Sequence, residues 1–323
     1  MKPLQFHKDG TFKIVQFTDI HWQNNNPADL CSLDLMNNIL DHETPDLVIF
    51  TGDMIHSELA DDPKTAFIHA VSAVTARNIP WAFVFGNHDA EEGITRDEIM
   101  AISKELPACL AQQGPAYIGG IGNYFLTIQS STDIDRIKTA LFLFDSGSYA
   151  PKQIGGSAWI RRDQIDWYIQ ESLHLEAKNE NRPIPSLSFF HIPLPEFNDL
   201  WDFHTSFGYN YEGVGCPKIN SGLFNAFLER GDVTGVFVGH DHVNDFWGNL
   251  HGIRLCYGRA TGFNTYGKED FPRGARVIKL YEANRDFETW LRLEGGVLMK
   301  DQPVHPPSFR DISVQLTKRL SLH

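Results

Sequence analysis

The chain has 323 residues, 42% of them hydrophobic, and a formal net charge of −13. This length allows one large domain or two ordinary ones, with a sizeable core. The acidic balance argues against a general nucleic-acid-binding surface, because such surfaces need positive charge to displace counterions. No apolar run is long enough to span a bilayer, and the first ten residues lack the apolar core of a signal peptide.

The four cysteines are scattered and form no C-x-x-C pair; they are Cys31, Cys109, Cys216 and Cys256. This usage fits a reducing compartment, or at most one or two disulfide bonds. We therefore expect a cytoplasmic protein, while secretion with a signal peptide already removed stays open.

The first part of the chain alternates apolar strands with helices. Strands are expected over 12–18, 46–51 and 80–85, and helices over 29–41 and 61–78. Near-continuous apolar strands that alternate with helices are typical of an α/β fold whose sheet is covered on both faces.

Each of these strands ends in residues suited to a metal site. Asp19 and His21 follow the first strand, Asp53 follows the second, and Gly86-Asn87-His88-Asp89 follows the third. Open α/β sheets place their sites at such strand ends. Asp89 is positioned to hold His88, as a carboxylate that fixes an imidazole tautomer. Taken singly, Asp53 also reads as a helix N-cap and the third motif as a plain turn.

The second part continues with strands over 124–129, 140–144, 186–190 and 236–238, and with helices over 161–177 and 219–229. His191 follows one strand, and His240 and His242 follow another. Alone, His191 reads as a core histidine and the other two as a surface pair. Five such motifs, all at strand ends, indicate a single site.

Three regions do not fit the alternating pattern. The aromatic segment 196–216 is expected to be irregular, either a lid that contacts substrate or a locally packed loop. Strands over 252–257, 275–281 and 287–293 have no helices between them and suggest a meander or the edge of a second sheet. We expect a single domain over 1–299 and a C-terminal extension over 300–323.

In order, these motifs resemble the calcineurin-like metallophosphoesterase superfamily over about residues 12–293. The resemblance implies a four-layer α/β/β/α sandwich with a binuclear metal centre at the sheet ends. Segments 190–196, 212–216, 239–245 and 256–258 are similar to one branch, which holds plant proteins labelled probable inactive purple acid phosphatases and fungal phosphoprotein phosphatases.

The chain departs from true purple acid phosphatases at their iron-binding tyrosine. That tyrosine belongs to a G-D-x-x-Y motif, and His56 stands at the matching position here. Their first motif also lacks a histidine that this chain has, His21. The resemblance therefore implies that His21 replaces the tyrosine as a ligand and that the protein is not purple.

The resemblance assigns a role to each motif residue. Its metal ligands would be Asp19, His21, Asp53 and His242 for one ion, and Asp53, Asn87, His191 and His240 for the other. Asp53 would bridge the two ions. His88 would protonate the leaving oxygen or stabilise phosphoryl charge, held by Asp89.

The expected cofactors are two divalent or transition-metal ions, and ligand type does not select among Mn, Fe, Zn and Ni. Two such ions about 3.5–4 Å apart clamp the attacking and leaving oxygens of an in-line displacement. The expected enzyme hydrolyses a phosphomonoester, on a small molecule or a phosphoprotein, by attack of metal-bound hydroxide. The alternatives are a phosphodiesterase acting on a nucleotide or lipid headgroup, and a non-catalytic phosphate-binding or scaffolding protein.

Overall fold

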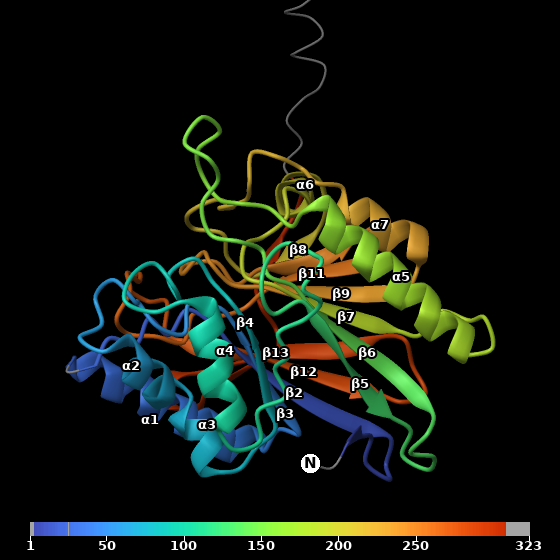
Figure 1. The fold of residues 1–323 in the computed structure, drawn as a ribbon, viewed down its shortest axis with the longest axis horizontal. Helices are drawn as coiled ribbons and strands as arrows, with labels where there is room; N and C mark the ends of the chain where they lie inside the picture. The colour runs from blue at the N-terminus through green and yellow to red at the C-terminus, as the bar shows by residue number, and fades with distance from the viewer. Residues whose placement is uncertain (1–2, 25, 308–323) are drawn as a thin grey trace, which may run out of the picture.

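The computed structural model describes residues 3–24 and 26–307, which form two large sheets covered by helices (Figure 1). One sheet has nine strands in the order β1 (Leu4–Gln5), β5 (Tyr124–Gln129), β6 (Ile137–Leu143), β7 (Ser186–Phe189), β9 (Val233–Val238), β11 (Ile253–Tyr257), β10 (Trp247–Leu250), β8 (Ser206–Phe207) and β15 (Val304–His305). The other has six, in the order β14 (Leu298–Met299), β13 (Phe287–Leu293), β12 (Gly274–Tyr281), β2 (Thr11–Phe17), β3 (Leu47–Thr51) and β4 (Trp81–Val84).

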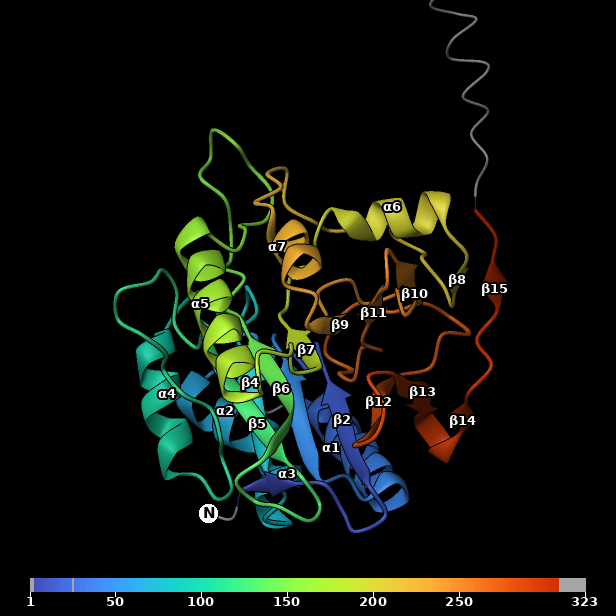
Figure 2. The same cartoon turned by 90° about the vertical axis from the view of Figure 1, so that its right-hand side faces the viewer.

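Helices cover the outer face of each sheet, as Figure 2 shows from the side. The six-stranded sheet is covered by α1 (Pro27–Glu43), α2 (Pro63–Ala70), α3 (Ser72–Ala76) and α4 (Arg96–Glu105). The nine-stranded sheet is covered by α5 (Arg162–Lys178), α6 (Glu196–Phe203) and α7 (Leu223–Arg230). A short 3₁₀ turn spans Glu294–Gly296. These layers form the predicted α/β/β/α sandwich.

Strand β2 shows how its sequence specifies two buried faces. Phe12 and Ile14 pack in the core between the sheets, whereas Val15 and Phe17 pack in the core under the helices. Successive side chains of a strand point to opposite faces, so a strand between two apolar layers needs apolar residues at nearly every position.

Parallel pairing brings the site-bearing strand ends together. β2, β3 and β4 pair in parallel in one sheet, as do β6, β7, β9 and β11 in the other. Their carboxyl ends therefore lie at one end of the sandwich. Every metal-ligand candidate follows one of these strands, so the pairing gathers the candidates at one edge of each sheet.

Several expected elements differ in detail. The helix expected over 61–78 is two helices, α2 and α3, because the backbone leaves helical geometry at Val71 (φ −99°, ψ 7°). Helix α4 and strands β1 and β10 were not predicted. The three strands expected after residue 250 separate: β11 joins the nine-stranded sheet, whereas β12 and β13 are antiparallel neighbours in the other. Strand β14, which was not predicted, pairs with β13.

The expectation that 196–216 is irregular is wrong for its first half, which holds α6 and β8. Trp201 stacks on His305 with ring centroids 3.7 Å apart, and Phe207 stacks on Trp247 at 4.8 Å. Strand β15 of the predicted extension pairs with β8, and the rest of that extension, 308–323, lies outside the described residues. These aromatic side chains therefore pack a sheet edge.

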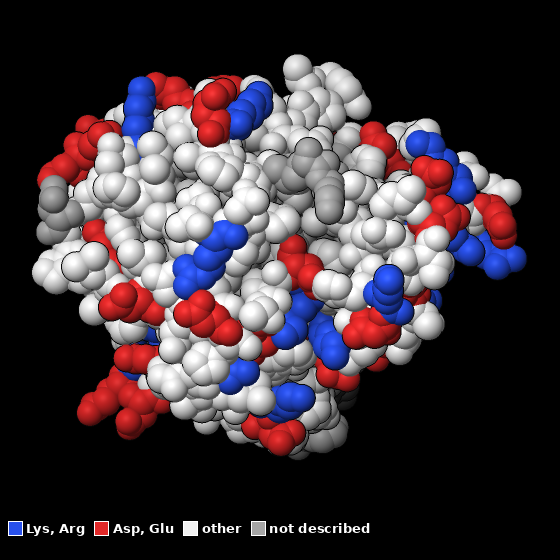
Figure 3. All heavy atoms as spheres, turned by 90° about the horizontal axis from the view of Figure 1, so that it is seen from below, with Lys and Arg blue, Asp and Glu red and all other residues white. Residues whose placement is uncertain are grey.

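The described surface and helices add three observations. Acidic and basic side chains are interspersed on the face drawn in Figure 3. Within the described residues, no helix has the length and apolar character needed to cross a membrane. All four cysteines are free thiols.

Candidate metal centre

The strand ends bring seven side chains into two adjoining groups that share one carboxylate. Ligand-type atoms of the first group lie within 4.8 Å of one another, and so do those of the second. The first group is Asp19, His21, Asp53 and His242; the second is Asp53, His191 and His240. Asn87 extends the second group, with Oδ1 3.2 Å from His191 Nε2. All the predicted ligands therefore lie together.

The first group is compact and closed to solvent. His21 Nε2 lies 3.2 Å from His242 Nε2 and 3.6 Å from Asp53 Oδ2. His242 Nε2 lies 3.4 Å from Asp19 Oδ1. The four side chains are all buried. Two imidazole nitrogens and two carboxylates that converge in this way form a typical N/O donor set for a divalent cation.

The second group is built around His191. Its Nε2 lies 3.1 Å from Asp53 Oδ2 and 3.3 Å from His240 Nδ1. Its Nδ1 donates to the Thr51 carbonyl over 2.8 Å, which leaves the Nε2 lone pair directed at the group. Hydrogen bonds of this kind set the tautomer and orientation of a metal-binding histidine.

Local backbone geometry explains why glycine appears in these motifs. A Cβ at Gly86 would lie 2.0 Å from Asp53 Oδ1, and one at Gly239 would lie 2.0 Å from Thr18 Oγ1. Four of the predicted ligands adopt positive φ, a conformation that costs energy and is concentrated at functional sites; they are Asp19, His21, Asp53 and His240.

The electrostatics of the centre fit a bound cation. Asp53 Oδ2 is buried and has no hydrogen-bond partner in the described structure. Burial raises the pKa of Asp53, but the nearby His191 outweighs it and the pKa falls well below its usual value. Burial lowers the pKa of His21 to about 3 and that of His240 to about 4, so both rings are neutral near pH 7, the form in which imidazole binds metal. A buried carboxylate is costly unless positive charge lies beside it, and a divalent cation can supply that charge.

The expectation that Asp89 holds the His88 ring is wrong. The Asp89 carboxylate accepts three backbone N–H groups, from Gly86 (2.7 Å), Asp53 (3.0 Å) and Ile55 (3.1 Å). It ties the loop after β4 to the loop after β3. The sequence motif places Asp89 beside His88 along the chain, but the turn directs the two side chains to different partners.

The partner of the His88 ring is Glu91, which the sequence analysis did not single out. His88 Nδ1 donates to Glu91 Oε2 over 2.7 Å, and Tyr149 Oη donates to Glu91 Oε1 over 2.6 Å. His56, at the tyrosine position of purple acid phosphatases, lies beside His88, with tilted rings whose centroids are 4.6 Å apart. A carboxylate three residues after a candidate proton donor was the available signal for Glu91.

The second half of the aromatic segment does reach the centre. Glu212 accepts from the Val243 backbone (2.7 Å) and from Tyr266 Oη (2.6 Å). The Tyr266 ring stacks on His242 with centroids 4.2 Å apart and is 56% exposed. The exposed Tyr266 ring therefore lies at the rim of the candidate centre.

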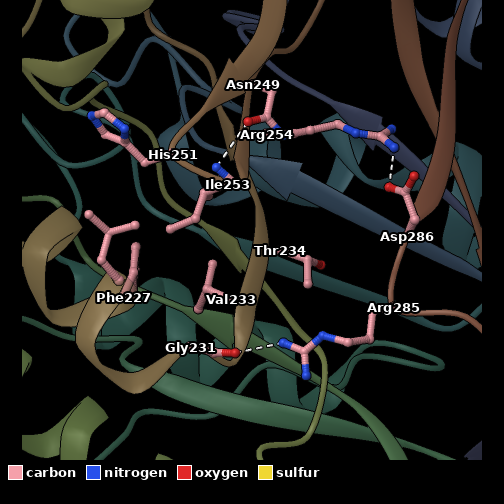
Figure 4. Close-up of a pocket in the computed structure, with 12 residues that line it drawn as sticks. Phe227, Gly231, Val233, Thr234, Asn249, His251, Ile253, Arg254, Arg285 and Asp286 are labelled. Carbon is pink, nitrogen blue, oxygen red and sulfur yellow. Dashed lines mark hydrogen bonds and ion pairs between the residues drawn. The ribbon is translucent and has the colours of Figure 1, made fainter.

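A separate cavity of about 420 Å³ lies at the starts of β9 and β11 (Figure 4). His240 and His242 of the candidate metal centre follow the other end of β9, so this cavity is remote from the centre. Its charged groups already have partners: Arg285 donates to the Gly231 carbonyl over 2.6 Å, and Arg254 pairs with Asp286. The cavity is therefore not part of the centre.

The sandwich and its buried Asp/His groups define a metal-dependent phosphoesterase architecture. The family model described as calcineurin-like phosphoesterase matches residues 12–244, and the chain belongs to this family. The family and the donor set together indicate a divalent-metal site.

Two named relatives indicate which branch of the family the chain resembles in sequence. The chain is 35% identical to "Probable inactive purple acid phosphatase 29" of Arabidopsis thaliana, over 91% of this chain and 85% of that protein. It is 34% identical to "Phosphatase DCR2" of Saccharomyces cerevisiae, over 91% of this chain and 55% of that protein. These matches confirm the branch that the sequence motifs indicated.

Solved structures agree on the fold. A dimetal phosphatase from Danio rerio superposes with a TM-score of 0.63 at 13% identity, covering 91% of this chain and 98% of that one. A Plasmodium protein described as the anchor in the inner membrane complex superposes with a TM-score of 0.52 at 12% identity, covering 96% and 94%. At this identity the likeness concerns the fold alone.

Proposed function

We propose that the chain is a dimetal phosphatase that hydrolyses a phosphomonoester by in-line displacement, with a small molecule or a phosphoprotein as substrate. The observation that carries this proposal is the position of Asp53 Oδ2, which lies 3.1 Å from His191 Nε2 and 3.6 Å from His21 Nε2. One carboxylate oxygen is thus shared between two donor groups, as a bridging ligand requires.

The residues present can hold two ions. Asp19, His21 and His242 would hold one, Asn87, His191 and His240 the other, and Asp53 both. When bound, such a pair of ions polarises the phosphoryl group and acidifies water at neutral pH. The ions would be Mn, Fe, Zn or Ni, because imidazole and carboxylate suit all four.

His88 is the proposed proton donor to the leaving oxygen. Its backbone N–H donates to Asp53 Oδ1 over 2.8 Å, which fixes it beside the shared carboxylate. Its ring lies 5.2 Å from the His21 ring and is partly exposed, so it faces the open side of the centre. A histidine so placed can give a proton to the leaving oxygen, and such general acid catalysis contributes about 10²–10⁴-fold.

A non-catalytic, phosphate-binding protein is the second candidate, favoured by the word "inactive" in the name of the Arabidopsis relative. The donor set argues against it, because a protein that only binds phosphate has no need for a bridging carboxylate with a partly exposed histidine beside it. The yeast relative, in addition, is named a phosphatase.

Elemental analysis of protein purified without added metal, paired with a rate comparison, tests the proposal. We expect two transition-metal ions per chain and faster turnover of 4-nitrophenyl phosphate than of bis(4-nitrophenyl) phosphate. A preference for the diester of about tenfold or more would show a phosphodiesterase instead. Metal-loaded protein that turns over neither ester nor a panel of phosphopeptides would favour the binding protein.

A further inference from the structure

A line of hydrogen bonds joins His88 back to the metal centre through two residues without an assigned role. His88 Nδ1 donates to one oxygen of Glu91 over 2.7 Å, and Tyr149 Oη donates to the other over 2.6 Å. Asn87 Nδ2 in turn donates to Tyr149 Oη over 3.3 Å. Both oxygens of Glu91 are engaged, and Asn87, a candidate metal ligand, closes the line.

The main chain around Glu91 is fixed as firmly as its side chain. The Glu91 backbone N–H donates to Ser57 Oγ over 2.8 Å, and Ser57 Oγ donates to the His88 carbonyl over 2.8 Å. Ser57 is buried. Because one hydroxyl ties both residues, the distance between the His88 ring and the Glu91 carboxylate is held by the backbone as well as by the side chains.

We propose that Glu91 is the positioning residue of His88, and that Tyr149 positions Glu91. The proposal rests on the proposed phosphatase function. With its Nδ1–H held by Glu91, the His88 ring presents Nε2 to the leaving oxygen. As the P–O bond breaks, its electron pair stays on that oxygen, the Nε2 proton of the His88 imidazolium joins it, and the ring is left neutral with its other proton on Nδ1. The Glu91 carboxylate stabilises the imidazolium before transfer.

The same neighbourhood has the composition of a third cation site, since ligand-type atoms of His56, His88 and Glu91 lie within 4.8 Å of one another. The contacts favour a hydrogen-bonded carboxylate instead. His56 Nε2 is 4.0 Å from Glu91 Oε2, whereas both Glu91 oxygens already accept short hydrogen bonds. The Tyr149 hydroxyl donates one of these two hydrogen bonds, so the carboxylate is satisfied without a cation.

The leaving group provides the test, because a proton donor matters most when the leaving oxygen is strongly basic. In Glu91→Gln we expect kcat on an alkyl phosphate to fall about ten- to a hundred-fold, with KM little changed. On 4-nitrophenyl phosphate, whose leaving group needs no proton, kcat should change by less than about twofold. Tyr149→Phe should show the same dependence on leaving group, with a smaller loss.

Glu92→Gln is the matched control, because Glu92 is the neighbouring, exposed glutamate. It should match the wild type on both substrates. Metal content and melting temperature are measured for each variant, so that loss of the centre or of the fold is visible. Equal losses on both substrates, no loss on either, or loss of metal from Glu91→Gln would each overturn the proposal.

A second readout does not depend on turnover. In zinc-loaded protein, the ¹⁵N shifts of His88 should report a ring protonated at Nδ1 in the wild type and in Glu92→Gln, and a changed ring state in Glu91→Gln. If the wild type hydrolyses no phosphoester, the proposed function fails while this measurement still decides the positioning role. An unchanged His88 spectrum in Glu91→Gln would refute it.

Discussion

Asp53 Oδ2 lies 3.1 Å from His191 Nε2, and both side chains are almost fully buried. Burial lowers the pKa of His191, but the adjacent carboxylate of Asp53 outweighs it and raises the pKa to about 9. Positive charge next to the buried carboxylate of Asp53 is therefore favourable. A divalent cation supplies that charge without occupying the imidazole nitrogen with a proton.

Replacement of this carboxylate should empty the centre. Asp53→Asn keeps the shape of the side chain but removes the anionic oxygen that both donor groups share. We expect metal content to fall from two ions per chain to less than one, and phosphatase activity to fall by about a hundredfold or more. This loss is larger than the usual effect of replacing a residue that only hydrogen-bonds to a metal ligand.

Elemental analysis and a 4-nitrophenyl phosphate assay on the same preparation measure both effects. Asp166→Asn is the control, since Asp166 lies on the exposed side of α5 and pairs only with Arg162 in the described structure. Full metal content in Asp53→Asn would rule out Asp53 as the bridging ligand.

Chelation should lower the stability of the wild type. The centre holds two buried carboxylates, Asp19 and Asp53, that lose their counter-charge when metal is removed. Metal that binds the folded state alone at a hundred times its Kd stabilises it by about 2.7 kcal/mol. We therefore expect the melting temperature to drop by several degrees on treatment with a chelator and to recover when metal is added back.

The Asp53→Asn variant provides the comparison for this measurement. It should melt at a lower temperature than the metal-loaded wild type and respond little to chelator, because it has little metal to lose. An equal chelator-induced shift in both proteins would mean that the stabilising metal binds elsewhere.

The sequence predicts the layers and the convergence of the candidate ligands because both depend on local patterns. Apolar strands followed by Asp19, Asp53 and His191 mark strand ends, and parallel pairing brings such ends together. The residues that hydrogen-bond to the candidate catalytic histidine depend on turn geometry, which the spacing of residues in the sequence does not reveal. The sequence analysis therefore wrongly assigned Asp89 as the partner of the His88 ring. It missed Glu91, the observed partner, although Glu91 lies three residues from His88.

The aromatic segment shows a second limit. In the sequence, Trp201 belongs to an aromatic segment that resembles a binding loop. In the structure it lies on α6 and stacks on the ring of His305, about a hundred residues later in the chain. Pairing between β8 and β15 spans about a hundred residues of sequence. Such long-range pairing has no local signature, since strand propensity reflects packing against neighbours that are distant in the chain.

We expect Asp89 to have a structural role, so that its replacement lowers the stability of the fold, whereas replacement of His88 lowers activity. Asp89→Ala leaves the backbone N–H groups of Gly86, Asp53 and Ile55 without their acceptor in a buried place. Each unsatisfied group costs about 1–3 kcal/mol, so we expect a loss of about 3 kcal/mol or more in the free energy of unfolding. His88→Ala should change stability little while lowering activity about 10²–10⁴-fold.

Urea unfolding of the two variants, followed by far-UV circular dichroism, separates these roles. If Asp89→Ala unfolded at the wild-type urea concentration, its carboxylate would not be the tie between the loops after β3 and β4. If His88→Ala kept full activity on alkyl phosphates, the assignment of His88 as proton donor would fail.

Iron-loaded protein should lack the purple colour of a ferric–tyrosinate. The tyrosine position of purple acid phosphatases is His56 here, and its ring lies 5.5 Å from that of His21, outside both donor groups. Tyr149 is the nearby alternative, but its hydroxyl is committed to Glu91 and burial raises its pKa to about 12. A visible spectrum after reconstitution with ferric iron should therefore show no tyrosinate charge-transfer band. A band that appears in the wild type and disappears in Tyr149→Phe would instead place Tyr149 on the metal, and would contradict the hydrogen-bonded role assigned to it.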